Sequence, residues 1–399
     1  MDFFAMGGRP LLSHFHHIRG IFAPGRLVSR STSAGPCIAK SSASASPSPE
    51  DQADLQTSSA PLTGMTSEDP PDTASDPPAA LHTYFRGEDV QIWDKAQYKT
   101  VKKLQDATRN RGQVILMTNV KTGSLVAVKQ MPNSWIRSNH TDFVKANPAE
   151  TEMPWQDVGC VSFLNKKSFE FACQLFGVWR NDEHTFVITT FASEGDLFKW
   201  CESGPPPGEQ RELHVHPVAQ QILRSVKRLH DFPIVHRDIS LENILIELSN
   251  GVNSVKLIDF GMASTERHFK NCVRGKASYQ APELHEDGEY DGFLSDAFSV
   301  GVTLYALLVR DYPWLSTRPG GCKCFGYVKK HGFRAYLAKR KLRNSNRKVG
   351  DVMSEPLKEL LEGLLSVDPE SRLTLGETAS EAGRRSVWDL PWTRTGGQT

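Results

Sequence analysis

The stretch His236-Arg237-Asp238 decides how this 399-residue chain is interpreted, because Asn243 follows its aspartate by five residues. Asp259-Phe260-Gly261 stands 21 residues after Asp238. Upstream, the run Val126-Ala127-Val128 leads into Lys129, and Ala281-Pro282-Glu283 stands downstream. One such triplet is common by chance, whereas four short motifs in this order form a specific pattern.

The segments around these motifs predict strands first and helices later. Residues 113–119 and 124–130 are β-rich runs on either side of Thr122-Gly123, which predicts a hairpin, and 184–191 predicts a further strand. Three later segments carry helical apolar patterns, the first with Pro217 near its first helical position: 217–230, 296–309 and 357–365. A β-rich part followed by a helical part indicates an α+β fold with two lobes.

The composition argues against several classes of protein. The 47 basic and 46 acidic residues give a net charge of +1, unlike a nucleic-acid binder with a strongly basic surface. The most apolar stretch, 300–309, is shorter than the ~18 residues of a membrane span, so we expect no transmembrane segment. Seven cysteines without framework spacing fit a reducing compartment, and we expect a cytoplasmic protein.

Residues 1–80 carry no pattern that would form a core. Residues 1–49 hold five Lys or Arg, nine Ser and a single acid, Asp2, whereas 50–80 hold seven acids and no Lys or Arg. Such a segment buries too little apolar surface to offset its ordering entropy, which predicts a disordered tail. Because an Arg- and Ser-rich, acid-poor start is also typical of organellar targeting, that alternative stays open.

The four motifs resemble those of the eukaryotic protein kinases, and the resemblance covers roughly residues 98–392. It implies the two-lobed kinase fold, which we divide into an N-lobe at 85–191, a C-lobe at 192–392 and a disordered end at 393–399. It also implies that the chain uses ATP and Mg²⁺ to phosphorylate a protein substrate. The Leu241-Glu242-Asn243 segment is nearer to the serine/threonine class than to the tyrosine kinases.

The chemistry of phosphoryl transfer explains these residue types. Negative charge passes through a loose transition state, so positioning and charge neutralisation dominate. The resemblance implies that Lys129 holds the ATP phosphates as a point charge. Asn243 and Asp259 are the implied oxygen ligands of Mg²⁺. Asp238 is the implied catalytic base that orients the substrate hydroxyl.

The remaining nucleotide contacts are also implied by resemblance. Thr189 falls at the gatekeeper position in front of the hinge between the lobes. Asp196 either contacts ribose or a basic substrate side chain, or caps a helix. The full set of expected contacts is Ala107, Arg109, Gly112, Val114, Ala127, Lys129, Thr189, Phe191, Ala192, Asp196 and Leu245.

The sequence departs from the family pattern at the glycine-rich loop. Of its three glycine positions, Ala107, Arg109 and Gly112, the last alone is glycine. Because glycines let backbone N–H groups approach phosphates, nucleotide affinity is in question, and Arg109 could compensate with its charge. The acid that pairs with Lys129 is either Asp157, which has apolar residues at +4 and +7, or Glu152.

A second departure lies in the catalytic loop, where Ser240 replaces the lysine of serine/threonine kinases. Lys276 stands where the family usually has threonine. In the family, the catalytic-loop lysine and this threonine meet near the catalytic aspartate. The pair of changes predicts a relocated charge, with Lys276 as a further catalytic residue. The alternative is that Lys276 points to solvent.

The segment from Asp259 to Glu283 lacks the usual phosphate acceptor. Cys272 stands at that position, and no Ser or Thr lies between Phe269 and Gly275. Ser264 and Thr265 are the candidate acceptors, so we expect little dependence on phosphorylation near the end of the segment. Further along the chain, we interpret Cys322 and Cys324 as two loop thiols rather than a metal site.

An active kinase is the main hypothesis, and a pseudokinase that acts as a nucleotide-binding or scaffold module is the alternative.

Overall fold

A six-stranded sheet forms the N-lobe. The structure, a computed structural model, describes residues 80–249, 251–380 and 383–394. Residues 1–79 of the tail predicted at 1–80, and residues 395–399 of the end predicted at 393–399, lie outside it. The sheet has the order β1-β5-β6-β4-β3-β2, and every pairing is antiparallel except β1 with β5. Its strands are β1 (Gln91–Ile92), β2 (Tyr98–Ala107), β3 (Gly112–Asn119), β4 (Leu125–Pro132), β5 (Leu175–Arg180) and β6 (His184–Thr190).

The predicted hairpin is confirmed as the pair β3–β4. Gly123 adopts φ 72° in the turn between them, a conformation that glycine reaches without a Cβ penalty. The strand predicted at 184–191 is β6. Strand β2 is an edge strand, mostly exposed, and its two register irregularities and its lysines oppose pairing with another chain.

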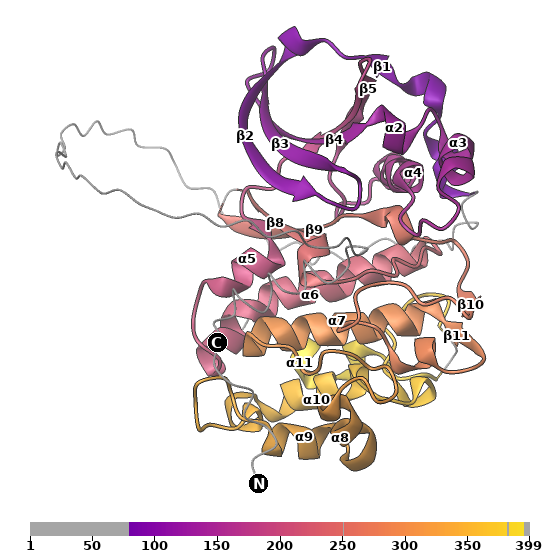
Figure 1. Cartoon of the computed structure of the whole chain (residues 1–399). Coiled ribbons are helices and arrows are strands. Elements are labelled where there is room, and N and C mark those ends of the chain that lie inside the picture. The colour runs from indigo at the N-terminus through magenta and orange to yellow at the C-terminus, as the bar shows by residue number, and fades with distance from the viewer. Residues whose placement is uncertain (1–79, 250, 381–382, 395–399) are drawn as a thin grey trace, which may run out of the picture. The chain divides into compact units, whose positions relative to one another are not determined.

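The two faces of this sheet are covered differently. One face buries a cluster that includes Tyr98, Val128 and Ile188. On the other face Met131, Val178 and Val187 pack with Trp155, which lies on α4. The helices of the N-lobe are α2 (Asn133–Ile136), α3 (His140–Ala146) and α4 (Pro154–Lys166). Figure 1 shows the strands β1–β5 and these helices together at the top of the view.

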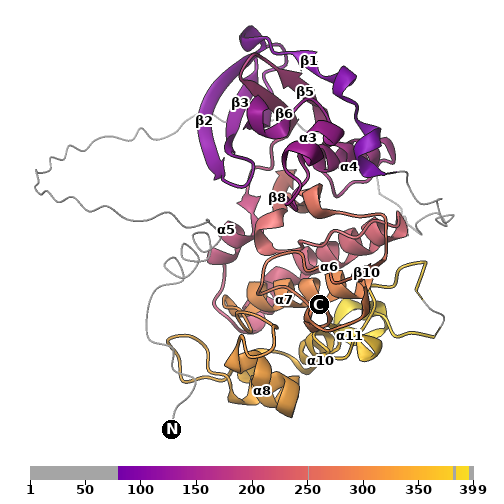
Figure 2. The same cartoon turned by 45° about the vertical axis from the view of Figure 1, so that its right-hand side comes forward.

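Helices dominate the C-lobe, below the N-lobe in Figures 1 and 2. They are α5 (Leu197–Glu202), α6 (Glu209–Asp231), α7 (Gly292–Val309), α8 (Lys323–His331), α9 (Phe333–Lys339), α10 (Glu355–Leu364) and α11 (Pro391–Arg394). Two small sheets accompany them, β7 (Gly195–Asp196), β8 (Ile244–Ser249) and β9 (Val252–Leu257), and β10 (His268–Lys270) with β11 (Glu289–Asp291). Short 3₁₀ helices occupy Leu81–Tyr84, Gly87–Asp89, Lys95–Gln97, Leu241–Asn243, Phe260–Met262, Pro282–His285, Val349–Val352, Pro369–Ser371 and Val387–Asp389.

Helix α7 is the central element of this lobe. All 18 of its residues are buried. In the described part of the chain, α7 is the one helix long and apolar enough to span a membrane, with a mean hydropathy of 1.6. Protein surrounds it completely, as expected for the core helix of a large lobe.

Three predicted boundaries differ from the structure. Helix α6 begins at Glu209, so Pro217 lies inside the helix and not at its start. Leu213, four residues earlier, is 61% exposed, so water can bond the carbonyl that the proline leaves without a donor. Helix α7 begins at Gly292, where the Asp291 carboxylate accepts from Phe293 N–H at 2.8 Å. At the end of the chain, α11 continues to Arg394, beyond the boundary expected at 392.

Candidate active site

The loop that carries Asp238 is held by the core of the C-lobe. The buried Asp296 carboxylate on α7 accepts hydrogen bonds from the backbone N–H of His236 (2.7 Å) and of Arg237 (2.9 Å). The Asn243 amide donates to the Asp238 carbonyl (2.8 Å) and to its Oδ2 (2.9 Å). Asp238 is therefore buried and fixed in orientation before any substrate arrives.

Lys276 approaches this aspartate from the segment on the other side of the site. Its Nζ donates to Ser240 Oγ at 2.6 Å and lies 3.3 Å from Asp238 Oδ2. Its backbone N–H also donates to Asp238 Oδ1 at 3.1 Å. The structure thus places an ammonium group beside Asp238, where Ser240 supplies none.

Lys129, on β4, pairs with Asp157 on α4. Its Nζ lies 3.2 Å from Asp157 Oδ2, while Asp157 Oδ1 accepts from Phe260 N–H at 2.9 Å. Burial of the ammonium would lower the pKa of Lys129, but Asp157, Asp259 and Glu152 outweigh it and raise that pKa. Lys129 therefore stays charged across the physiological range, and Asp157 ties it to the segment that begins at Asp259.

Glu152 pairs with two residues other than Lys129, and the sequence did not reveal them. Asn110 Nδ2 donates to Glu152 Oε1 at 2.6 Å, and Arg109 Nη1 lies 3.4 Å from Oε2. Burial and the nearby Asp259 raise the pKa of Glu152 to about 7, although Lys129, Asn110 and Arg109 oppose the shift. Glu152 thus anchors the tip of the β2–β3 turn, and Arg109 also reaches to 3.8 Å from Asp238 Oδ2.

The oxygen atoms of Asn243 and Asp259 form a donor set suited to a hard cation. Asn243 commits its amide N–H₂ to Asp238, which leaves the amide oxygen as an acceptor. Asp259 ends the stretch after β9 in a left-handed conformation, φ 67°. Among the described residues no group of three or more His, Cys, Asp or Glu could hold a metal. One carboxylate and one amide oxygen still fit Mg²⁺, which takes most of its ligands from phosphate and water.

The sheet register brings most of the expected nucleotide contacts into neighbouring positions. Ala107 faces Gly112 across the β2–β3 turn, and Val114 faces Lys129. Ala127 lies opposite Thr189. Thr189 is near the end of β6, and Phe191 and Ala192 follow that strand in the linker. In the C-lobe Asp196 lies opposite Leu245. Asp196 Oδ1 accepts from Lys199 N–H at 2.8 Å, so the structure shows the helix cap, and the ribose contact stays a prediction.

Contacts with the C-lobe hold the segment that follows Asp259 in place without a phosphorylated residue. Arg237 Nη2 lies 2.8 Å from Cys272 Sγ, and its guanidinium sits 4.1 Å from the Phe269 ring centre. Ser264 forms a backbone bridge with Val235. At the end of the segment Glu283 makes a two-bonded pair with buried Arg372, at 2.5 and 2.9 Å.

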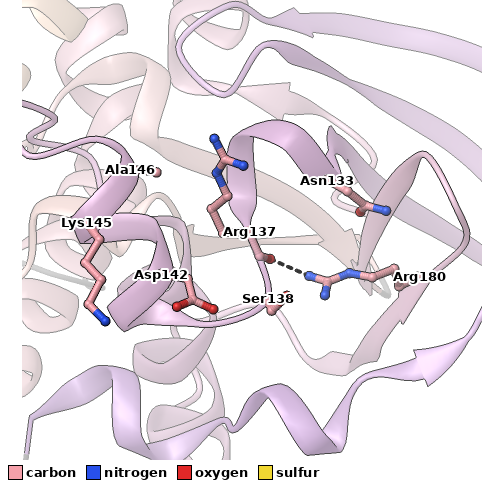
Figure 3. Close-up of a pocket in the computed structure, with 7 residues that line it drawn as sticks. All are labelled: Asn133, Arg137, Ser138, Asp142, Lys145, Ala146 and Arg180. Atoms are coloured by element: carbon pink, nitrogen blue, oxygen red, sulfur yellow. Dashed lines mark hydrogen bonds between the residues drawn. The ribbon is translucent and has the colours of Figure 1, made fainter.

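A separate hollow lies on the N-lobe (Figure 3). It is lined by Asn133, Arg137, Ser138, Asp142, Lys145, Ala146 and Arg180, and Arg180 donates to the Arg137 carbonyl at 2.6 Å. None of the expected site residues lines this hollow. It therefore does not belong to the site built around Asp238.

Comparison with known proteins gives a family match that covers the residues of this site. The family model described as "Protein kinase domain" matches residues 109–382, more than half of the chain. Mitosis inducer protein kinase cdr1 of Schizosaccharomyces pombe is 30% identical over 210 residues, which are 52% of this chain and 32% of that protein.

Two further relatives carry serine/threonine kinase names. Probable serine/threonine-protein kinase fhkD of Dictyostelium discoideum is 32% identical over 54% of this chain and 29% of its own length. Serine/threonine-protein kinase GIN4 of Saccharomyces cerevisiae is 28% identical over 66% of this chain and 22% of its own length. The chain spans about a third or less of the length of these curated relatives.

Proposed function

Because this chain belongs to the protein kinase family, we propose that it transfers the γ-phosphate of ATP to a serine or threonine hydroxyl of a protein substrate. The observation that carries the proposal is the convergence of Lys129, Asp157, Asp238, Asn243 and Asp259 on one site. The serine/threonine class is supported by the names of the relatives and by the Leu241-Glu242-Asn243 segment.

Each group has a role that follows from its charge and surroundings. Asp238, fixed by Asn243, orients the substrate hydroxyl and accepts its proton. Lys129, kept charged and held by Asp157, positions the nucleotide phosphates. Asn243 and Asp259 would hold Mg²⁺, which neutralises phosphate charge when it is bound.

The tip of the β2–β3 turn takes over the phosphate-binding role that glycines have in kinases with a regular glycine-rich loop. Arg109 presents a guanidinium within 3.8 Å of Asp238, so the tip contributes positive charge where backbone N–H groups usually act. Glu152 and Asn110 hold this tip in place. The missing glycines would favour a pseudokinase, whereas the position of Arg109 beside Asp238 supports retained phosphate binding.

Phosphoryl transfer by the full chain tests this proposal. We expect labelled γ-phosphate to appear on a mixture of Ser and Thr peptides with Mg²⁺, and not on Tyr peptides. Asp238→Asn should lower turnover about 10²–10⁴-fold while ATP binding persists, because it removes the base but keeps the shape. Binding of ATP without turnover by the natural chain would support the pseudokinase instead.

A further inference from the structure

The hollow on the N-lobe collects basic side chains from three separate segments (Figure 3). Arg137 follows α2, Lys145 lies on α3, and Arg180 ends β5. Asp142 is the one acid among the described residues that line the hollow. The volume of the hollow is about 640 Å³, within the ~300–1,000 Å³ that is usual for ligand pockets. The hollow is therefore large enough and positive enough to receive an anionic ligand.

The protein itself does not neutralise these three cations. In the part of the chain that the structure describes, no carboxylate forms an ion pair with Arg137, Lys145 or Arg180. Asp142 instead accepts a hydrogen bond from Asn139 Nδ2 at 2.9 Å. Burial lowers the pKa of Arg180, and no neighbouring carboxylate opposes this shift. Because like charges around one cavity repel each other, an anion bound among them would relieve an unfavourable interaction.

Arg180 is held in place before any ligand binds. Its Nε donates to Thr185 Oγ1 at 2.8 Å, and its Nη2 donates to the Arg137 carbonyl at 2.6 Å. The buried Thr185 hydroxyl in turn donates to Asn133 Oδ1 at 2.8 Å. Nη1 of Arg180 has no hydrogen-bond partner among the described residues. A guanidinium that is fixed on one side and open on the other can bind an oxyanion with little further loss of side-chain entropy.

Arg137 occupies a backbone conformation that is typical of glycine. Its φ of 61° and ψ of −171° lie in a region that residues with a Cβ rarely adopt. The turn at the end of α2 fixes this conformation, because the Arg137 N–H donates to the Asn133 carbonyl at 3.0 Å. An arginine at such a position is explained if its charged side chain has a use in the hollow.

We propose that this hollow binds the phosphate of a phosphoserine or phosphothreonine within a partner peptide. The three cations supply charge-assisted hydrogen bonds to the phosphate oxygens, and an arginine fork matches the geometry of a phosphate. The uncharged residues that line the rest of the hollow leave room for the peptide backbone on either side of the phosphate. Asp142 repels a continuous row of negative charges, which favours a single phosphate over a nucleic acid or an anionic membrane.

The proposal does not depend on phosphoryl transfer by this chain, because none of these residues belongs to the site around Asp238. Such a hollow would recruit partners that are already phosphorylated.

Fluorescence anisotropy of labelled peptides with the full chain tests this binding. The probe is a peptide library with a fixed phosphoserine between randomised positions, and the same library with unmodified serine is its control. Excess ADP and Mg²⁺ keep the peptides away from the nucleotide site. We expect the phosphorylated library to bind about tenfold more tightly or better than the unmodified one. Inorganic phosphate should compete only at much higher concentration, because it lacks the contacts of the flanking residues.

Variants of the lining residues separate binding from folding. Lys145→Ala and Arg137→Gly should each weaken binding of the phosphorylated library about tenfold, because each removes a charged donor to the phosphate. Neither side chain bonds to another described residue, and glycine suits the backbone at 137, so urea unfolding should show no loss of stability. Asp142→Asn should strengthen binding, since it removes the repulsive charge. The matched control is Lys99→Ala, an exposed lysine on the far edge strand β2, which should leave binding unchanged.

Equal binding of the phosphorylated and unmodified libraries would overturn the proposal. Unchanged affinity in both Lys145→Ala and Arg137→Gly would overturn it too, as would weaker binding by Asp142→Asn. Competition by inorganic phosphate at the same concentrations as the phosphopeptides would mean a site for free anions and not for a peptide. Vesicles of phosphatidylcholine and phosphatidylserine form the last arm. If they bind through Arg137 and Lys145 while the phosphopeptides do not, the hollow faces a membrane and the peptide assignment is wrong.

Discussion

The Lys276 ammonium contacts the Asp238 carboxylate and the Ser240 hydroxyl, and it lies 3.9 Å from the Glu242 carboxylate. The ammonium lies 3.3 Å from the first and 2.6 Å from the second. Asp238 and Ser240 are buried, and the Lys276 side chain is partly exposed. A cation so close to the catalytic aspartate can stabilise the charge of the transferring group. Stabilisation of this kind is worth about 2.7–4 kcal/mol where it has been measured for oxyanion donors.

Lys276→Thr should therefore lower turnover about 100-fold or more, because it removes the one ammonium that the structure places on Asp238. The double variant Lys276→Thr with Ser240→Lys returns a cation from the other side and should recover much of the rate. Steady-state phosphorylation of one peptide by the three proteins measures both effects. Normal turnover in the single variant, or no recovery in the double variant, contradicts the relocated charge.

Single residues differ in how far the sequence could predict their partners. Helical spacing favoured Asp157 over Glu152 as the partner of Lys129, and the structure shows the pair with Asp157. Glu152 could not be placed, because its partners, Asn110 and Arg109, lie in a turn about 40 residues away. No periodic pattern encodes a contact between a turn and an irregular segment, since it depends on how the sheet and α4 pack.

Among the elements, the β3–β4 hairpin shows why one glycine of the loop is retained. A Cβ on Gly112 would lie 2.0 Å from the Gln130 carbonyl oxygen, which belongs to the backbone of the neighbouring strand. The contact cannot be relieved by a side-chain rotation, so the two strands would have to separate. The glycine is required by the packing of the sheet as well as by any approach of a phosphate.

Gly112→Ala should destabilise the protein by about 1–3 kcal/mol, the usual cost of overfilling a packed site. Gly326→Ala is the matched control, because a Cβ there meets nothing within 4 Å in the middle of α8. It should stabilise by about 0.5–1 kcal/mol, since alanine is the better helix former. Urea unfolding of the three proteins measures both changes, and equal stability of the two variants would contradict this account of Gly112.

The elements also show the limits of sequence patterns. The hairpin follows from two β-rich runs on either side of a glycine turn, the late amphipathic helix follows from 3.6-residue spacing, and both are present. The start of α6 was misplaced because proline usually begins a helix, whereas here eight helical residues precede Pro217. The cost of an internal proline is offset by the packing of the long helix against α7, which the sequence of one element does not reveal.

Across the whole described region, one buried histidine connects three distant parts of the chain. His230 on α6 is fully buried between Asp296 on α7 (3.1 Å) and Glu377 (2.8 Å), and its ring stacks on Phe293. Burial would lower the pKa of His230, but the hydrogen bonds and charges of the two carboxylates raise it to about 9. Glu377 shows the reverse, since its bond to His230 outweighs burial and lowers its pKa to about 2.

These shifts fix how stability should depend on pH. A histidine whose pKa is raised in the folded state stabilises fully below about pH 6.5, and this contribution is lost as pH rises through about 9. A carboxylate whose pKa is lowered stabilises above about pH 4.5, and this contribution is lost as pH falls towards about 2. The buried cluster therefore contributes most between about pH 4.5 and 6.5.

Raising the pH from 6.5 to 9 should accordingly reduce the free energy of unfolding by roughly 3 kcal/mol through His230 alone, at about 1.4 kcal/mol per pKa unit. Because other groups titrate over the same range, the measurement is the difference between the natural chain and His230→Gln, from urea unfolding at several pH values. The glutamine can still donate to one carboxylate but cannot titrate, so its curve should lack this slope. Glu377→Gln removes one of the two charges that hold the proton on His230, and should move the loss of stability to lower pH. Parallel curves for the natural chain and His230→Gln would mean that the histidine is neutral in the fold. Asp296 would then orient the loop of Asp238 without an imidazolium beside it.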